Sequence, residues 1–237
     1  MAYTYEYPAH YVTVDPVIFG AQSTRDTCDL KVLLIERGVA GQPFHGQWAL
    51  PGGFVKPEES LDAAVARELQ EETGVTGVFA EQLYTFGDPK RDPRGRVITV
   101  AYLALIDRGR CKLQAGTDAA RAEWFDLDRL PPLAFDHAEI LGKALARLRA
   151  KVHYEPIGFN LLPPLFTMAQ LHALYEAVLD RTLDLPNFRR AITRLNVLRE
   201  GGEETNVSHR PAKLFRFDEK AYGRMLRSGI HFDTGKL

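Results

Sequence analysis

Residues Gly53–Val75 read GFVKPEESLDAAVARELQEETGV, and this stretch decides the fold of the first half of the chain. Ser60 is a favourable N-cap, no Gly or Pro follows before Gly74, and Gly74 can adopt the left-handed conformation that ends helices. We therefore predict a helix from about Ser60 to Gly74. At about 100° per residue, one side of this helix is apolar and should face a core: Leu61, Ala64, Val65 and Leu69.

Three glutamates interrupt this amphipathic pattern. Glu68 and Glu72 fall in the apolar sector, and Glu71 lies at its edge. Like charges three and four residues apart repel, and a buried unpaired carboxylate costs several kcal/mol. Arg67 borders the cluster but can neutralise only one carboxylate. A solvated charged face is the alternative. A divalent ion accounts better for the cluster, most simply Mg²⁺, which binds through a few carboxylates together with substrate phosphates.

The spacing of the whole stretch resembles the Nudix box. Gly53 is followed by five residues and Glu59, and then by seven residues and the run RELQEETGV at residues 67–75. The resemblance implies a family that cleaves nucleoside diphosphates linked to another group, using Mg²⁺ or Mn²⁺. Every defining position of the box is intact, so nothing in it indicates an inactive enzyme.

The resemblance also implies roles for single residues. Glu59 would assist in the outer shell of the metal site, and Arg67 would orient the glutamates through salt bridges. The proton acceptor stays open between Glu68 and Glu123. The metal ligands implied by the resemblance are the Gly53 carbonyl and the side chains of Glu68, Glu71 and Glu72.

Segments on either side of the box supply candidate substrate contacts. Arg37 follows the strand-like run KVLLIE (31–36), at a strand end where a phosphate-binding side chain could lie. Residues 46–53, GQWALPGG, resemble the segment that precedes the box in Nudix proteins. That resemblance implicates Trp48, and glycines at Gly52-Gly53 let the backbone approach a ligand closely.

A turn-rich segment, DPKRDPRGR at residues 88–96, carries four cations. It is either a solvated hairpin loop or a basic flap near the phosphates of a charged substrate, with Arg94 and Arg96 as the contacts. His137 lies in the first turn of a second predicted helix. It could touch substrate, although a role confined to that turn is the simpler interpretation. Asp136 and Glu139 have capping-box spacing, which alone accounts for both.

These elements predict a mixed sheet flanked by two helices, the second of which starts at Asp136. This arrangement is what a Nudix α/β/α sandwich requires, and the resemblance covers about residues 8–150. The flanking loops suggest a subfamily near the ADP-ribose pyrophosphatases. The expected strands are 11–19 and 31–36, separated by a polar loop over 20–29, and then 78–86, 97–106 and 122–126.

The C-terminal third predicts a winged helix-turn-helix. Thr167 would cap a helix, and Pro186 would lie in the first turn of the next one. A strand from Val197, a polar loop over 201–211 and a return strand at 213–217 would form the wing, and a last helix follows. We expect a Nudix domain at 1–152, a linker at 153–164 and a winged helix-turn-helix domain at 165–237.

One face of the second helix in this region is basic, which makes double-stranded DNA a candidate partner. A solvated helix face is the alternative, and the acidic Glu203 and Glu204 at the wing tip count against phosphate contact. The combination of domains resembles the Nudix-related transcriptional regulators of NAD metabolism and their enzymatic relatives. The candidate DNA contacts are Arg189, Arg190, Thr193, Arg194, Arg210 and Lys213.

Composition is consistent with a soluble globular chain of 237 residues, 45% hydrophobic and 26% charged. Residues 1–150 hold 17 Lys and Arg against 21 Asp and Glu, whereas residues 151–237 hold 13 against 10, so the basic surplus lies in the C-terminal third. The start MAYTYEYPAH lacks the regions of a secretory signal, and no apolar run is long enough to span a bilayer. We therefore expect a cytoplasmic protein without membrane contact.

Two functions remain at this point. The first is an Mg²⁺- or Mn²⁺-dependent hydrolase that cleaves the pyrophosphate of ADP-ribose or a related nucleoside diphosphate derivative. The second is a regulator that senses ADP-ribose and binds DNA, and both could reside in one chain. In either case we expect a homodimer, because helix-turn-helix proteins usually bind DNA as two-fold pairs.

Overall fold

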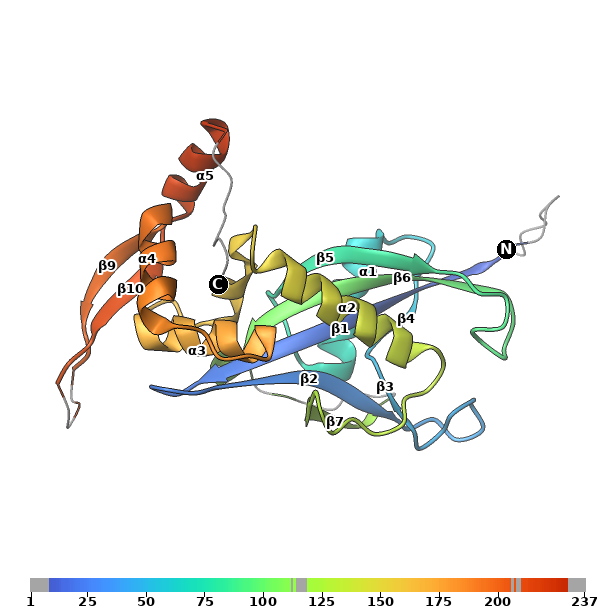
Figure 1. Cartoon of the computed structure of the whole chain (residues 1–237). Coiled ribbons are helices and arrows are strands. Elements are labelled where there is room, and N and C mark those ends of the chain that lie inside the picture. The colour runs from blue at the N-terminus through green and yellow to red at the C-terminus, as the bar shows by residue number, and fades with distance from the viewer. Residues whose placement is uncertain (1–8, 112, 114–118, 206, 208–209, 230–237) are drawn as a thin grey trace. The chain divides into compact units, whose positions relative to one another are not determined.

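The computed structural model describes residues 9–111, 113, 119–205, 207 and 210–229, and the chain divides into two compact units (Figure 1). The first unit comprises residues 1–18, 32–104 and 112–144, and the second comprises residues 19–31, 105–111 and 145–237. Each unit is therefore discontinuous in sequence. The expected boundaries at 152–153 and 164–165 remain a prediction.

A mixed sheet of seven strands dominates the first half of the chain. Its main path runs in the order β3-β2-β1-β6-β5, with β4 paired to β1 and β7 paired to β2. Its core is apolar and fully buried, with Ile18, Leu33 and Leu103 at its centre. The strands are β1 (Tyr11–Ser23), β2 (Cys28–Arg37), β3 (Trp48–Ala49), β4 (Gly53–Phe54), β5 (Phe79–Phe86), β6 (Val97–Asp107) and β7 (Ala119–Asp126).

The expected polar loop over residues 20–29 is wrong, because β1 and β2 extend through most of it. Only residues 24–27 connect them. There the backbone N–H of Thr24 donates to the carbonyl of Thr27 at 2.9 Å, and the two threonine hydroxyls are 2.7 Å apart. Pairing between long neighbouring strands outweighs the weak strand preference of the Gly and polar residues in this segment.

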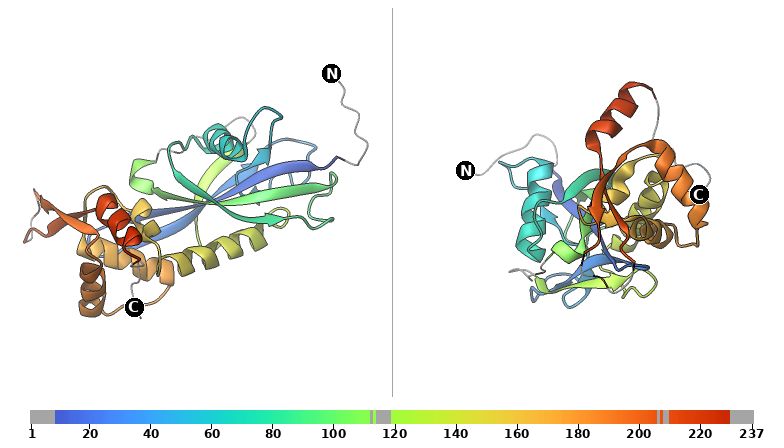
Figure 2. Two further views of the ribbon diagram at one scale, coloured as in Figure 1. Left: turned by 90° about the horizontal axis from the view of Figure 1, so that it is seen from above. Right: turned by 90° about the vertical axis from the view of Figure 1, so that its left-hand side faces the viewer.

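Helix α1 (Leu61–Thr73) confirms the helix predicted from the opening stretch. The Ser60 hydroxyl accepts from the Ala63 backbone at 3.2 Å, and Gly74 takes a left-handed φ of 72°. Figure 2 shows α1 and the start of α2 (His137–Lys151) on opposite faces of the sheet, which is the expected sandwich. Asp136 does not serve the capping box expected for α2. Its carboxylate instead accepts hydrogen bonds from the Arg91 guanidinium at 2.7 and 2.8 Å.

The second unit contains the expected helix-turn-helix and wing. Helix α3 (Met168–Leu179) starts with a complete capping box from Thr167 and Gln170. Helix α4 (Leu185–Leu195) starts at the N-cap Asp184 and buries Phe188 and Ile192. The wing and last helix are β9 (Leu198–Glu203), β10 (Lys213–Phe217) and α5 (Glu219–Arg227).

Two features of the wing differ from the sequence expectation. A short strand β8 (Phe166–Thr167) pairs with β10, giving a three-stranded sheet in the order β8-β10-β9. Strand β9 also extends to Glu203, into the segment expected to be loop from residue 201. Gly201 in this extension lies close to Leu165, because a Cβ there would be 2.3 Å from the Leu165 side chain. Residues 206, 208 and 209 of the expected loop lie outside the described part.

The segment 153–164, expected as a linker, contains the 3₁₀ helix η2 (Pro156–Leu161). Its Phe159 ring stacks on Phe217 at 4.6 Å, and Leu161 and Leu162 are buried. This segment therefore packs within the second unit. Across the described ranges, no helix is both long and apolar enough to cross a membrane.

Candidate functional site

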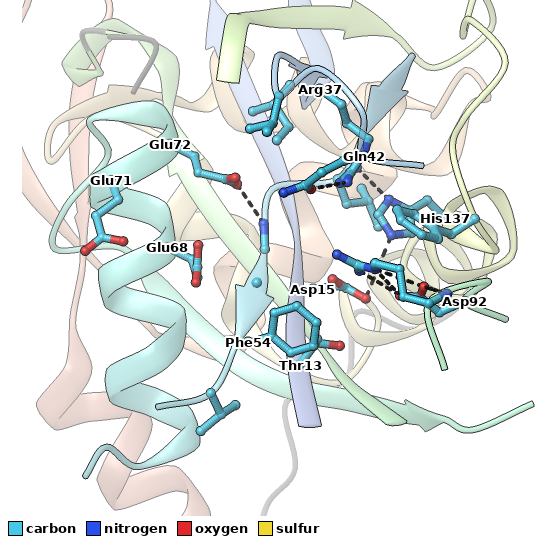
Figure 3. Close-up of a pocket in the computed structure, with 18 of the residues that line it drawn as sticks. Thr13, Asp15, Arg37, Gln42, Phe54, Glu68, Glu71, Glu72, Asp92 and His137 are labelled. Carbon is cyan, nitrogen blue, oxygen red and sulfur yellow. Dashed lines mark hydrogen bonds and ion pairs between the residues drawn. The ribbon is translucent and has the colours of Figure 1, made fainter. Parts of the chain in front are cut away.

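Helix α1 presents two glutamates to a cavity of about 570 Å³ in the first unit (Figure 3). Glu68 and Glu72 are each 7% exposed and point inward, whereas Glu71 lies at the outer edge. The backbone N–H of Gly52 donates to Glu72 at 2.8 Å. A Cβ at Gly53 would lie 2.4 Å from a Glu68 oxygen, so glycine is required for this close approach. The sequence pattern predicted all these positions.

Arg67 binds more of the cluster than its single charge suggested. It donates to Glu59 at 2.6 and 3.0 Å, to Glu68 at 2.6 Å and to Glu71 at 3.0 Å, and also to the Phe54 carbonyl at 3.1 Å. Its hydrogen bond lowers the pKa of Glu59 to about 2, while Glu59 raises the pKa of Arg67. Burial raises the pKa of Glu68, an effect that Arg67 opposes.

The donor set suits a hard divalent cation. Carboxylate oxygens on one helix face, next to a glycine backbone, are ligands that Mg²⁺ and Mn²⁺ prefer. Within the described residues, however, no three His, Cys, Asp or Glu side chains converge on a single metal position. Arg67 already bonds Glu68 and Glu71, so a metal ion would compete with this arginine for both carboxylates. The chemistry of the site therefore fits a divalent ion after a rearrangement of side chains.

The cavity brings together most of the candidate site residues. Arg37 at the end of β2 and Arg94 from the β5–β6 connection line it, as do Gly52 and Gly53. Burial lowers the pKa of Arg37, and the neighbouring Arg94 lowers it further. The α1 residues that also line the cavity are Arg67, Glu68, Glu71 and Glu72.

Four other candidates are not among the residues that line this cavity. Arg96 donates to the Gly87 carbonyl at 2.6 Å, which stabilises the β5–β6 connection. Trp48 packs edge-on against Phe125. Glu59 bonds Arg67 instead. The Glu123 side chain is 43% exposed and pairs with Arg121.

A buried ionic network lies at the cavity, which Asp15, Arg91 and His137 line, and of these three the sequence suggested only His137 as a possible substrate contact. Arg91 bonds Asp136 at 2.7 and 2.8 Å and Asp15 at 3.2 Å. The Leu50 N–H donates to Nδ1 of His137 at 2.9 Å, so Nδ1 is unprotonated and the neutral ring carries its proton on Nε2. Burial lowers the pKa of His137, which favours this neutral form. Asp15, Arg91 and His137 are far apart in sequence, so no single motif predicts that they meet. The sequence indicated only that Arg91 lies in a turn-rich segment and His137 in the first turn of a helix.

Aromatic rings and arginines form the outer wall of the cavity. The Phe135 ring lies 4.9 Å from the Arg37 guanidinium and 5.5 Å from that of Arg94, and Arg94 also lies 5.0 Å from the Phe54 ring. Phe135 has a φ of 53°, an unusual backbone conformation for a bulky residue. Asp92 holds Arg94 through bonds of 2.7 to 3.2 Å. The wall thus combines flat apolar surfaces with fixed cations.

Helix α4 of the second unit presents an exposed face with three arginines and Thr193. No ion pair between these arginines and a carboxylate is found in the part of the chain that the structure describes, although Arg190 hydrogen-bonds Asn187. On the wing, Lys213 pairs with Glu200 at 2.8 Å, which raises the pKa of Lys213. Arg210 is exposed in the loop. The α4 positions are Arg189, Arg190, Thr193 and Arg194.

A sandwich with a glutamate-bearing helix at its cavity, joined in one chain to a winged helix, defines a Nudix protein with a DNA-binding type of second domain. Comparison with protein families agrees. A family model described as NUDIX domain matches residues 12–148, and one described as NrtR DNA-binding winged helix domain matches residues 158–217. The chain belongs to the Nudix family and carries an NrtR-type winged helix.

Individual proteins resemble this chain over different lengths. The ADPR responsive transcriptional repressor NtrR of Acinetobacter baylyi is 38% identical over 96% of this chain and 92% of its own. The crystal structure of Shewanella oneidensis NrtR complexed with a 27mer DNA is 33% identical, with a TM-score of 0.76 over 93% of this chain and 97% of its own. The ADP-ribose pyrophosphatase of Methanocaldococcus jannaschii is 47% identical, over 48% of this chain and 64% of its own.

Proposed function

We propose that this protein is a DNA-binding regulator that responds to ADP-ribose or a closely related nucleoside diphosphate derivative. The observation that carries the proposal is the exposed arginine face of α4 in a chain that also contains a Nudix cavity. The ADPR responsive transcriptional repressor NtrR of A. baylyi is 38% identical over 96% of this chain, and this supports the proposal. Because α4 lacks acidic partners among the described residues, its charges are available to DNA phosphates.

The cavity suits the chemistry of such a ligand. Arg37 and Arg94 supply fixed positive charge for a diphosphate, and the Gly52-Gly53 backbone allows close approach. The flat rings of Phe54 and Phe135 offer stacking surfaces for a base. The carboxylates of α1 would bind the ligand through a divalent ion, Mg²⁺ or Mn²⁺, rather than directly.

The proposal is tested by a DNA titration at fixed salt, with and without saturating ADP-ribose. The duplex is first selected by the protein from a random pool. Allosteric coupling typically changes affinity by about 5- to 150-fold, and we expect ADP-ribose to weaken DNA binding within that range. AMP, which lacks the diphosphate and second sugar, serves as the control ligand. Identical curves, or no selected duplex, would overturn the proposal.

Hydrolysis of the same ligand is a second function that one observation favours: the three glutamates of α1, Glu68, Glu71 and Glu72, all line the cavity. A bound divalent ion lowers the pKa of an attacking water and offsets charge on the transferring phosphoryl group. Glu68 is then a better proton acceptor than Glu123, because it is buried at the cavity with a raised pKa, whereas Glu123 pairs with Arg121 outside it. Arg67 and Glu59 would keep the glutamates in position.

Product formation tests this second function directly. ADP-ribose is incubated with the protein and Mg²⁺ or Mn²⁺, and AMP and sugar phosphate are measured. We expect turnover with metal and none with a chelator. Absence of turnover with both metals, in a protein that still binds ADP-ribose, would leave the regulator without an enzyme activity.

A homodimer is part of the proposal. A winged helix that reads DNA usually acts as a two-fold pair, with half-sites about one helical turn apart. Light scattering at micromolar concentration should therefore give about twice the chain mass of 26.6 kDa. A monomer at that concentration would contradict the dimer and weaken the case for specific DNA binding.

A further inference from the structure

Asp15 on strand β1 adds a carboxylate to the cavity, separate from the α1 glutamates that would reach a phosphate through a divalent ion. The residue is 6% exposed and lines the cavity wall (Figure 3). Its Oδ2 accepts from Arg91 at 3.2 Å, and its Oδ1 faces Gly52 so closely that a Cβ there would lie 2.7 Å away. A carboxylate repels phosphate oxygens at contact distance. Without a bridging cation, Asp15 therefore favours an uncharged ligand group over a phosphate.

The Asp15 carboxylate has unused capacity to accept hydrogen bonds. An ionised carboxylate offers about four acceptor positions. Arg91 fills one, but this arginine binds Asp136 more closely, at 2.7 Å. Nε2 of His137 is 3.9 Å from Oδ2, which exceeds hydrogen-bond distance. Among the described residues, none donates a hydrogen bond to Oδ1.

Thr13 adds a second polar group with the same property. It lies two residues before Asp15 on the same face of β1, is 5% exposed, and also lines the cavity. Its hydroxyl is buried and has no hydrogen-bond partner among the described residues, although its carbonyl accepts from Thr99 at 3.2 Å. A buried hydroxyl without a partner is destabilising, so such groups in native proteins call for an explanation.

We propose that Asp15, supported by Thr13, determines specificity for a free 2-hydroxyl of a ribose in the ligand. This inference rests on the proposed binding of a nucleoside diphosphate derivative. A hydroxyl can donate to Oδ1 of Asp15 and exchange a hydrogen bond with Thr13, whereas a phosphate ester at that hydroxyl would meet the carboxylate. The subsite therefore selects an unmodified ribose and rejects its phosphorylated form.

The backbone of Gly52 explains why the selected group is a sugar rather than the base. Its N–H bonds Glu72, the predicted metal ligand, and its other side contacts Asp15. The sugar is the group next to the diphosphate, and the base lies one sugar further away. A group held beside Gly52 is therefore a sugar when the diphosphate is at the α1 glutamates. The stacking surfaces of Phe54 and Phe135 remain for the base.

The test is a cycle of protein and ligand changes measured by calorimetry. ADP-ribose is compared with two analogues, each lacking one 2-hydroxyl, on the adenosine or on the terminal ribose. A hydrogen bond to a charged group is stronger than one between neutral groups, so one analogue should bind the wild type about 10-fold or more weakly. In Asp15→Asn that difference should shrink to about 3-fold or less. The analogue affected identifies the ribose.

Asp136→Asn is the matched control. It also removes one carboxylate partner of Arg91, but Asp136 is not among the residues that line the cavity. It should therefore keep the full discrimination against the affected analogue. If both variants lose discrimination equally, Asp15 acts only by holding Arg91 and the inference is wrong. It is also wrong if neither analogue binds the wild type more weakly than ADP-ribose does.

A second pair of variants separates ligand binding from folding. Thr13→Val removes a buried hydroxyl without a partner, so it should not lower thermal stability but should weaken ADP-ribose binding about 2- to 10-fold. Tyr175→Phe removes another such hydroxyl, in the core of α3, and should leave ligand binding unchanged. Unchanged binding by Thr13→Val would remove Thr13 from the subsite. If the wild type fails to bind ADP-ribose at all, the proposed function fails instead.

Discussion

Helix α1 carries a cluster of three glutamates and helix α4 a face of three arginines, and the surroundings of the two groups differ. On α1, Glu68 and Glu72 are buried at a cavity, and Arg67 bonds two of the three glutamates. On α4, all three arginines are exposed, with no ion pair to a carboxylate in the described part of the chain. Both helices are amphipathic, so the helical pattern alone does not separate these two situations.

The difference indicates two kinds of partner. Buried like charges are strongly unfavourable unless they are neutralised. The site on α1 therefore suits a small cation that binds together with a ligand and neutralises the glutamates. Exposed cations cost little in water and attract a large polyanion over a distance limited by salt. Substitutions on α1 should therefore affect ligand binding and hydrolysis at one site. Substitutions on α4 should affect association with DNA across a surface.

The largest expected effect is that of Glu72→Gln. Gln keeps the size and the helix preference of Glu but removes a charged metal ligand. Loss of several kcal/mol of transition-state stabilisation should lower hydrolysis roughly 10³-fold or more. Turnover of ADP-ribose with Mg²⁺ measures this, and DNA binding without ligand should not change.

The control for this change is Glu58→Gln, the same substitution at an exposed residue before α1. It should keep wild-type turnover. Retention of more than about a tenth of the activity by a folded Glu72→Gln protein would contradict the metal-ligand role.

A smaller effect is expected from Arg190→Ala on α4. Loss of one phosphate contact should weaken DNA binding about 5-fold or more and reduce the slope of log affinity against log salt by about one unit. ADP-ribose binding should be unchanged. Titrations at three or more salt concentrations measure both quantities.

Arg227→Ala is the matched control, because Arg227 is an exposed arginine of α5, beyond the matched winged-helix segment at 158–217. It should leave the salt slope unaltered. Equal effects of the two substitutions would mean that net charge, rather than the face of α4, governs binding to DNA.

The smallest effect concerns Glu59 and acid stability. The hydrogen bond from Arg67 lowers the pKa of Glu59 from 4.5 to about 2 in the folded protein. A depressed carboxyl pKa stabilises the fold above about pH 4.5, and this contribution is lost as the pH falls from 4.5 toward 2. Between about pH 5 and pH 3, the melting temperature of Glu59→Gln should therefore fall less than that of the wild type. Thermal melts of both proteins across this pH range measure the difference. Parallel pH curves for the two proteins would contradict the pairing.

Local patterns predicted α1 and the helix-turn-helix well, for identifiable reasons. The cap at Ser60 and the left-handed Gly74 depend on neighbouring residues only, as do the capping box at Thr167 and the start of α4 near Pro186. The Nudix spacing also singled out the glutamates of α1, which the structure places at the cavity. These features depend on residues that are close together in sequence, so they can be predicted without the tertiary structure.

Long-range pairing decided what local patterns missed. The extension of β1 and β2 through residues 20–29 depends on neighbouring strands, and β8 exists because β10 pairs with it. The sequence positions of Arg96 and Trp48 suggested contact with substrate. In the structure, Arg96 bonds the Gly87 carbonyl and Trp48 packs on Phe125. A side chain's direction follows from its tertiary neighbours and not from the order of residues.

The sequence by itself therefore determined the family, the glutamate helix and the basic helix, because each depends on spacing within a single segment. Only the tertiary structure placed Asp15, Arg91 and Asp136 together, from a strand, a loop and a helix start up to 121 residues apart. Buried charges attract one another strongly when the surrounding fold excludes water, and that condition exists only once the sheet and helices have packed.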